Sequence, residues 1–144
     1  MSLRKLILRA DAVFLGFAAF TAFFFADIPG VFLAKGPLAS IGAAAPQAGI
    51  GFLEAHGLAF ILAIILWRVA SARFWHLIGA GTHVLLGTCN LIFWEFFVST
   101  DSLVMGYVTT GLHWVFVVLQ VLAAAGVLGR TDAREALARA AWAA

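Results

Sequence analysis

The sequence predicts an all-α integral membrane protein, a bundle of four transmembrane helices with both termini on the cytoplasmic side. Of its 144 residues, 64% are hydrophobic and only 11% are charged, against about 25% charged residues in a soluble domain. A water-soluble chain of this length cannot hide so much apolar surface, because small domains leave a large share of their surface wet. We therefore expect a single domain whose main solvent is the lipid bilayer.

Four apolar segments have the length of a membrane span, which needs about 20 residues to cross a hydrocarbon core of about 30 Å. They cover residues 10–26, 51–70, 74–98 and 103–128. We predict helices because lipid offers backbone groups no hydrogen-bond partner, and no segment has the alternating pattern of a barrel strand. The basic start of the chain resembles a signal peptide, but no small-residue cleavage site follows it, so we expect a retained first span.

The segments outside the spans differ in length and composition. Residues 27–50 are mostly apolar and contain all three prolines, so we expect an interfacial segment of a short helix with turns on the outer side. Residues 99–102 are expected to form a tight turn. The Ala-rich segment 131–144 is predicted to be a short amphipathic helix at the cytoplasmic surface.

Basic residues favour one orientation of the chain. Eight of the nine Lys and Arg residues flank the predicted spans on one side, and only Lys35 lies on the other. The eight are Arg4, Lys5, Arg9, Arg68, Arg73, Arg130, Arg134 and Arg139. The positive-inside rule places their side in the cytoplasm, and we expect the protein in a bacterial inner membrane. No Lys/Arg run or stripe is present, so nucleic-acid binding is not expected.

Polar residues inside the predicted spans are the candidates for function, because such residues are rare in lipid and tend to face the bundle interior. His83 lies about 13 Å into the third span and His113 about 15 Å into the fourth, so both fall near the midplane. Asn90 shares a helix stripe with His83, and Gln120 shares one with His113. We therefore predict a ligand-binding site formed by His83, Asn90, His113 and Gln120.

Three interpretations of this site remain open. In the first, the site holds the polar head of a small apolar ligand, such as a quinone. In the second, His83 and His113 ligate a b-type haem and the protein carries electrons. In the third, the polar side chains only hydrogen-bond across helices as packing contacts, and the protein is a structural or assembly protein without a ligand.

A second polar site is predicted near the outer surface, formed by Glu54, His56 and Glu95. Carboxylate and imidazole groups are suitable ligands for zinc or iron, and they also carry protons. The Glu-x-His spacing does not direct both side chains along one helix face. No metal site is therefore assigned.

Two polar residues near the cytoplasmic ends of their spans, Asp11 and His76, are expected to be structural. We expect Asp11 to pair with Arg9 or with an arginine near the turn between the second and third spans. Cys89 is the only cysteine and can form neither an internal disulfide nor a cysteine cluster. The chain has no nucleophile arrangement, Gly-rich phosphate loop or HExxH motif, so the sequence assigns no catalytic residue.

Several marks in the first half of the chain occur together in a known family. They are Arg9 and Gly16 in the first span, the run Lys35-Gly36-Pro37, Glu54 early in the second span, and the basic turn from Arg68 to Arg73. With this layout the chain resembles the DoxX-like group of small four-helix bacterial membrane proteins. That family's Gly-rich stretch after the Glu is reduced here to Gly57. The resemblance implies an accessory subunit of a membrane redox or thiol-oxidation system, beside a membrane protein partner or a second copy.

Overall fold

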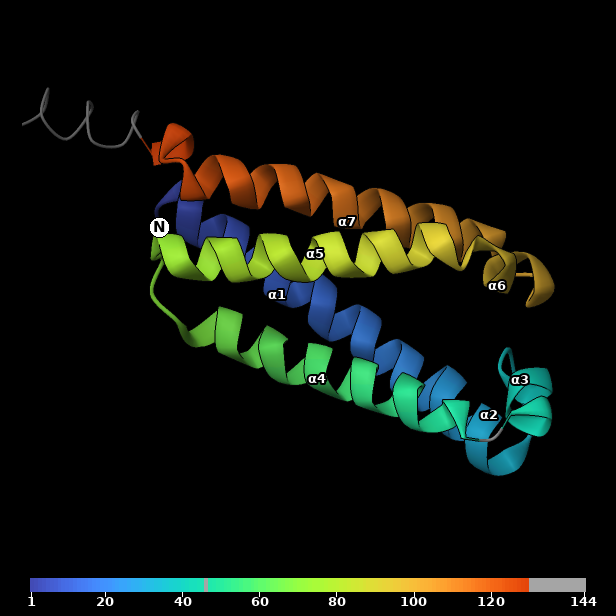
Figure 1. The fold of residues 1–144 in the computed structure, drawn as a ribbon. Coiled ribbons are helices and arrows are strands. Elements are labelled where there is room, and N and C mark those ends of the chain that lie inside the picture. Colours follow the sequence, from blue (N-terminus) through green and yellow to red (C-terminus); the bar gives the residue numbers. More distant parts are fainter. Residues whose placement is uncertain (46, 130–144) are drawn as a thin grey trace, which may run out of the picture.

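The computed structural model describes residues 1–45 and 47–129, and the regular structure of this part is all helical (Figure 1). Its four long helices are α1 (Leu3–Ala22), α4 (Ala48–Arg68), α5 (Arg73–Ile92) and α7 (Leu103–Ala124). Its short elements are η1 (Phe23–Asp27), α2 (Ile28–Leu33), α3 (Ala39–Ala44), α6 (Trp94–Ser99) and η2 (Val127–Gly129). The predicted all-α class is confirmed here, and the predicted helix at 131–144 lies outside the described residues.

Three helices are long and apolar enough to cross a membrane. They are the continuous helix Leu3–Leu33, α4 and α7. The other long helix, α5, does not reach the same apolarity, because it carries His76, His83 and Asn90 among its twenty residues. The helix with the most polar side chains is therefore the one that needs other helices around it.

The first helix continues beyond Ala26, where the sequence predicts its end. Pro29 lacks an N–H group, and its ring crowds the carbonyl one turn earlier. The π-helical turn Phe23–Asp27 ends two residues before Pro29 and widens the helix there. This local widening accommodates the proline without ending the helix. The chain then continues helically to Leu33.

The predicted interfacial segment contains two short helices, α2 and α3, that pack through glycines. A Cβ at Gly30 would clash with Leu38, and one at Gly42 would meet the Gly30 carbonyl at 2.6 Å. The two backbones therefore approach more closely than any larger residue allows. The result is a compact hairpin at one end of the molecule (Figure 1).

The third predicted span, 74–98, is divided in the structure. The helix α5 stops at Ile92, and Phe93 takes φ −100° and ψ 34° before α6 begins. This break turns Trp94 and the following residues relative to α5. A short turn at Thr100–Ser102 then leads into α7; the sequence predicts a turn at 99–102, and Ser99 instead ends α6.

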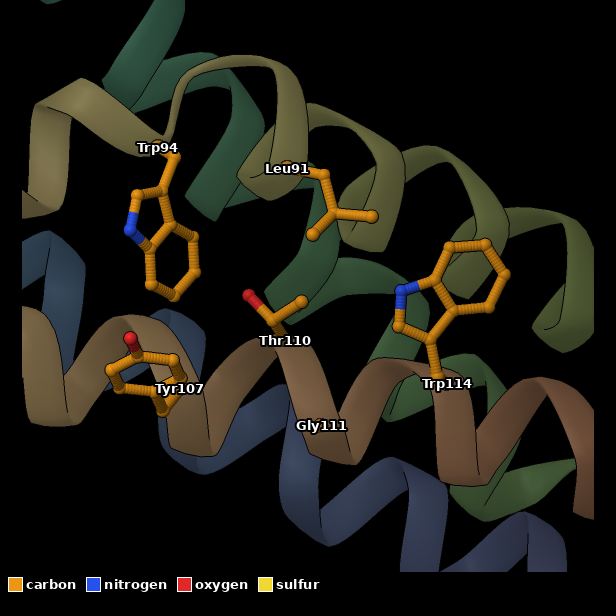
Figure 2. Close-up of a pocket in the computed structure, with 6 residues that line it drawn as sticks. All are labelled: Leu91, Trp94, Tyr107, Thr110, Gly111 and Trp114. Carbon is orange, nitrogen blue, oxygen red and sulfur yellow. The ribbon is translucent and has the colours of Figure 1, made fainter.

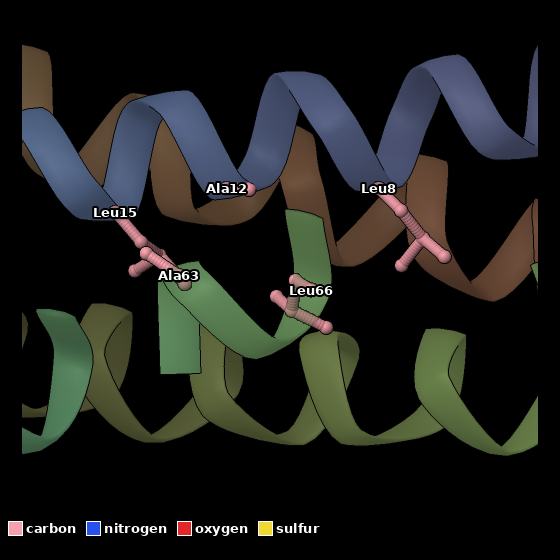
Figure 3. Close-up of a cluster of buried hydrophobic side chains, with 5 residues drawn as sticks. All are labelled: Leu8, Ala12, Leu15, Ala63 and Leu66. Atoms are coloured by element: carbon pink, nitrogen blue, oxygen red, sulfur yellow. The ribbon is translucent and has the colours of Figure 1, made fainter. Parts of the chain in front are cut away.

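The long helices pack as two pairs, α1 with α4 and α5 with α7 (Figure 1). The buried apolar cluster belongs to the first pair: Leu8, Ala12 and Leu15 of α1 lie against Ala63 and Leu66 of α4 (Figure 3). The helix α1 also contacts α5 and α7. It is therefore the element that joins the two pairs.

The two ends of the molecule differ in what they carry. The N-terminus, the turn between α4 and α5 and the end of α7 lie together at one end, and α2, α3 and α6 lie at the other (Figure 1). The first end holds the basic residues Arg4, Lys5, Arg9, Arg68 and Arg73, whereas Lys35 follows α2. The charge asymmetry of the sequence thus becomes an asymmetry between the two ends of the structure.

Candidate functional site

The centre of the candidate site is Asp11, on the third turn of α1. Its side chain is 0% exposed. One carboxylate oxygen, Oδ1, lies 2.7 Å from Nε2 of His83 on α5, and the other, Oδ2, accepts a hydrogen bond from Nε2 of Gln120 on α7. Burying a carboxylate is strongly unfavourable unless donors surround it. Here two helices supply one donor each.

Because an ionised carboxylate only accepts hydrogen bonds, Asp11 sets the direction of the bonds around it. The amide of Gln120 must turn its NH₂ group to Asp11, which leaves its oxygen to accept from Nδ1–H of His76 at 2.5 Å. The other nitrogen of His76 then accepts from the hydroxyl of Ser71, at 3.2 Å. One arm of the network therefore runs from Asp11 to the turn between α4 and α5, where Ser71 is half-buried.

The other arm runs from Asp11 through His83 to His113. The Nδ1 atoms of the two histidines lie 2.8 Å apart, so one proton is shared between them. When His83 is neutral, its proton is on Nε2 facing Asp11, and its Nδ1 accepts from Nδ1–H of His113. When His83 is protonated, it donates at both nitrogens. This arm therefore has two hydrogen-bonded states that differ by one proton.

Aromatic side chains enclose the two histidines. The ring of Phe14 is stacked on His83 with 5.9 Å between centroids, and it meets His113 edge-on at 5.4 Å. Phe116 is stacked on the same His83 ring at 5.1 Å. His83 is 0% exposed and His113 is 7% exposed. This apolar shell strengthens the electrostatic interactions inside it, because the local dielectric constant is low.

Of the four residues predicted as a ligand site, three lie in this network. His83 and His113 are hydrogen-bonded to each other, and Gln120 bonds to Asp11. Asn90 does not join them: its side-chain amide donates to the hydroxyl of Thr109 at 3.3 Å. Asn90 is seven residues beyond His83, about 10 Å along the helix, which is too far for a shared contact.

The predicted outer polar site is not assembled in the described structure. Glu54 and Glu95 are exposed, and neither makes a side-chain hydrogen bond within the described ranges. His56 instead lies 2.6 Å from Asp27, through its Nδ1 and the Oδ2 of the carboxylate. Asp27 is 0% exposed and belongs to the π-helical turn of the first helix. The end of the molecule that carries α2 and α3 thus holds a second Asp–His pair.

The prediction that Asp11 pairs with an arginine is wrong. The guanidinium of Arg9 lies over the ring of Trp67, 4.2 Å from its centroid, and Asp11 turns to α5 and α7. Sequence reasoning also missed His76 as part of the network. One feature of the sequence could have indicated a role for Asp11: it is the one acidic residue in the stretch from Leu6 to Ala26.

In residues 1–45 and 47–129, no group of three or more His, Cys, Asp or Glu side chains is placed to hold a metal ion. No protein-family model, curated protein or solved structure matches the chain. The chemistry of the site therefore follows from its own residues: a buried carboxylate, two linked imidazoles and a third imidazole bridged to the carboxylate by an amide.

The network requires glycine at position 79. A side chain there would lie 2.8 Å from Nε2 of Gln120 and 2.9 Å from Oδ2 of Asp11, whereas one at Gly81 would meet no atom within 4 Å. We expect Gly79→Ala to destabilise the protein by about 1–3 kcal/mol, the usual cost of overpacking. Gly81→Ala should be neutral or stabilising, because Ala favours a helix by about 1 kcal/mol over Gly.

The measurement is the unfolding free energy of both variants in detergent, followed by circular dichroism. Both substitutions add one methyl group to the same helix, so the helical propensity term cancels. Equal stability of the two variants would contradict the network geometry.

Proposed function

We propose that the protein is an accessory subunit of a membrane redox system, in which the Asp11–His83–His113 arm holds and transfers a proton within the membrane. The electron and proton acceptor is a small apolar ligand such as a quinone. The observation that carries this proposal is the fully buried Asp11 carboxylate with both oxygens hydrogen-bonded, one of them to a histidine that shares a proton with a second histidine.

The chemistry of the network supports a proton-carrying role. Ionisable groups at mid-membrane depth are unfavourable and commonly form proton relays in membrane proteins. His83 and His113 can exchange a proton along their hydrogen bond, and Asp11 stabilises the protonated state by its charge. The Gln120 amide donates and accepts without releasing a proton, so it positions Asp11 and His76. The proton-carrying part is therefore the arm from Asp11 to His113.

A quinone is the acceptor that suits such an arm. Its reduction to a quinol takes up one proton for each electron, and both reactant and product stay in the bilayer. The resemblance to DoxX-like proteins adds the expectation of a redox partner that supplies the electrons. On this proposal the chain has no catalytic residue of its own for electron transfer.

The membrane arrangement is part of the proposal. We place α1 with η1 and α2, α4, α5 with α6, and α7 across the bilayer as a four-helix bundle. The basic residues at the end that carries the N-terminus support a cytoplasmic location for that end. The exposed apolar side chains along these helices, such as Phe17, Ile61 and Val118, then contact lipid or a membrane protein partner.

The alternative of a haem carrier uses the same histidines. A haem iron binds two imidazoles on opposite faces of the porphyrin, whereas His83 and His113 bond directly to each other. This direct bond favours the proton-carrying role. A purely structural role, with the network acting only as a packing contact between helices, is the other alternative.

The proton arm predicts a specific set of histidine tautomers. Nitrogen-15 NMR of histidine-labelled protein in lipid should show His83 with its proton on Nε2, and His113 with its proton on Nδ1. On acidification, one histidine of this pair should become doubly protonated. Asp11→Asn should abolish this doubly protonated signal over the same pH range, because it removes the charge that stabilises it.

Glu54→Gln is the matched control, since it removes an exposed carboxylate that contacts no histidine of the network. It should leave the histidine spectrum of the arm unchanged. Histidines that titrate alike in the wild type and in Asp11→Asn would refute the proton-carrying role and favour the structural one.

The proposed orientation predicts the labelling of single cysteines. In a Cys89→Ala background, Ser99→Cys should react with a membrane-impermeant maleimide in intact spheroplasts. Ser2→Cys should react only after the membrane is opened, because we place it in the cytoplasm. Both serines are exposed in the structure, so accessibility within the protein does not decide the result. The reverse labelling pattern would show that the protein has the opposite orientation in the membrane.

A quinone ligand and a haem predict different absorbance spectra and different organic extracts for the purified protein. Protein purified in mild detergent should show no Soret band, and its organic extract should contain a quinone. A Soret band that disappears in both His83→Ala and His113→Ala would establish the haem alternative in place of this proposal.

A further inference from the structure

A groove on the side of the molecule lies between α7 and the junction of α5 with α6. Its volume is about 390 Å³, within the range of about 300–1,000 Å³ typical of small-molecule sites. We call it the aromatic groove; its walls are Leu91, Trp94, Tyr107, Thr110, Gly111 and Trp114 (Figure 2). None of the four residues that the sequence predicts as a ligand site lines it.

Two features of the fold create the groove. The break at Phe93 separates α5 from α6, and Trp94 lies directly after it, with its ring 4.8 Å from that of Tyr107. The helix has no side chain at Gly111, so the groove is open there. An added Cβ at Gly111 would meet no atom within 4 Å. The groove is therefore open above Gly111 and bounded by aromatic rings at its ends (Figure 2).

The floor of the groove carries a polar group without a partner. Thr110 is only 8% exposed, and its hydroxyl is buried without a hydrogen bond in the described part of the chain. The neighbouring Thr109 differs, because its hydroxyl donates to the Met105 carbonyl at 2.7 Å. An unpaired buried hydroxyl costs about 1–3 kcal/mol. In Figure 2, the Thr110 side chain points between Trp94 and Trp114.

The position of the groove restricts its occupant. Tyr107 is 66% exposed and Leu91 is 53% exposed, on the flank of α5 and α7. In a membrane this flank faces lipid, so the occupant enters from the bilayer and is lipophilic. Aromatic walls stack on a planar ring, and the Thr110 hydroxyl can donate to a carbonyl oxygen once a rotation about the Cα–Cβ bond of Thr110 brings the buried oxygen to the groove. A flexible acyl chain offers neither feature.

We propose that the aromatic groove binds the head of a lipophilic quinone, with the ring against Trp94 and Trp114 and a carbonyl oxygen on Thr110. This inference rests on the proposed function for its choice of ligand. It places that ligand outside the helix bundle, beside the network instead of within it.

The groove and the network are close to each other across α7. An added Cβ at Gly87 of α5 would lie 3.3 Å from the Cβ of His113 and 3.2 Å from Nε1 of Trp114. His113 and Trp114 are consecutive residues on opposite sides of this contact. The proposed quinone site therefore borders the histidine at the free end of the proton arm.

The test is a titration of the full chain in lipid nanodiscs with decylubiquinone, followed by the quenching of tryptophan fluorescence. Gly111→Leu fills the groove from a position where an added Cβ meets no atom within 4 Å, and it should raise the Kd at least tenfold. Gly81→Leu is the matched control: it adds the same side chain at another open glycine and corrects for quenching by quinone dissolved in lipid. Its Kd should equal that of the wild type.

Two substitutions of Thr110 test its proposed hydrogen bond to the quinone carbonyl. Thr110→Val keeps the shape of the side chain and should raise the Kd about fivefold, the value of one hydrogen bond of about 1 kcal/mol. Thr110→Ser keeps the hydroxyl and should bind within about twofold of the wild type. Thermal melts by circular dichroism confirm that each variant is folded before its Kd is compared.

Three results would overturn the inference. They are an absence of saturable quenching in the wild type, equal Kd values for Gly111→Leu and Gly81→Leu, and equal competition by decanol, which marks an acyl-chain groove. Loss of binding in His83→Ala with full binding in Gly111→Leu would place the ring in the bundle core instead. The histidine NMR of Asp11→Asn tests the proton arm separately, so either proposal can fail while the other stands.

Discussion

The carboxylate of Asp11 joins the two halves of the molecule. The buried apolar cluster of α1 is shared with α4, and Trp75 and Leu86 of α5 pack against its edge. The polar links of α1 to the second pair are those of Asp11, with His83 on α5 and with Gln120 on α7. In lipid, apolar side chains gain little from leaving a solvent as apolar as themselves, so small residues and polar contacts hold helices together. Asp11 supplies such a contact to two helices at once. It therefore reinforces the contacts of Phe14 with His83 and Phe116 that also join the two pairs.

The same helix repeats the arrangement near its other end. Asp27 lies sixteen residues beyond Asp11, about 24 Å along the helix, and contacts His56 of α4. One Asp–His pair connects α1 to the second helix pair, and the other connects the π-helical turn after α1 to α4. The π-helical turn sets the rotation of Asp27 about the axis, because a single π turn shifts every later residue of the helix. Two buried carboxylates therefore bind one helix to its neighbours at two points along its length.

Expected helix depth and helix face were enough to bring His83 and His113 together from sequence. His83 and His113 lie at similar depths on consecutive antiparallel helices, and they are hydrogen-bonded in the structure. The partner of Asp11 could not be found in this way, because sequence periodicity gives the face of a helix but not the helix it meets. Arg9 was the nearest opposite charge along the chain, yet it lies over Trp67 on α4.

The local breaks in the helices were hidden for a different reason. Pro29 predicts a helix end from local stereochemistry, and the continuous helix through it depends on a π turn that no residue pattern marks. Phe93 has no breaking tendency in an apolar run, so the division between α5 and α6 is a tertiary effect. That division places Trp94 at the wall of the aromatic groove, so the groove was not visible in the sequence either.

The location of a ligand site in such a protein depends on which polar groups remain unpaired. The sequence draws attention to the most polar residues of the spans, but polar groups inside a membrane protein satisfy each other first, because an unpaired group is costly there. Asp11, Gln120 and both nitrogens of His83 are all engaged within the network. A ligand that competed for them would have to break these bonds. The hydroxyl of Thr110 is less conspicuous in the sequence and has no bond to lose. A carbonyl that reaches it gains a hydrogen bond without breaking one, which favours the groove over the bundle core as the place for a ligand.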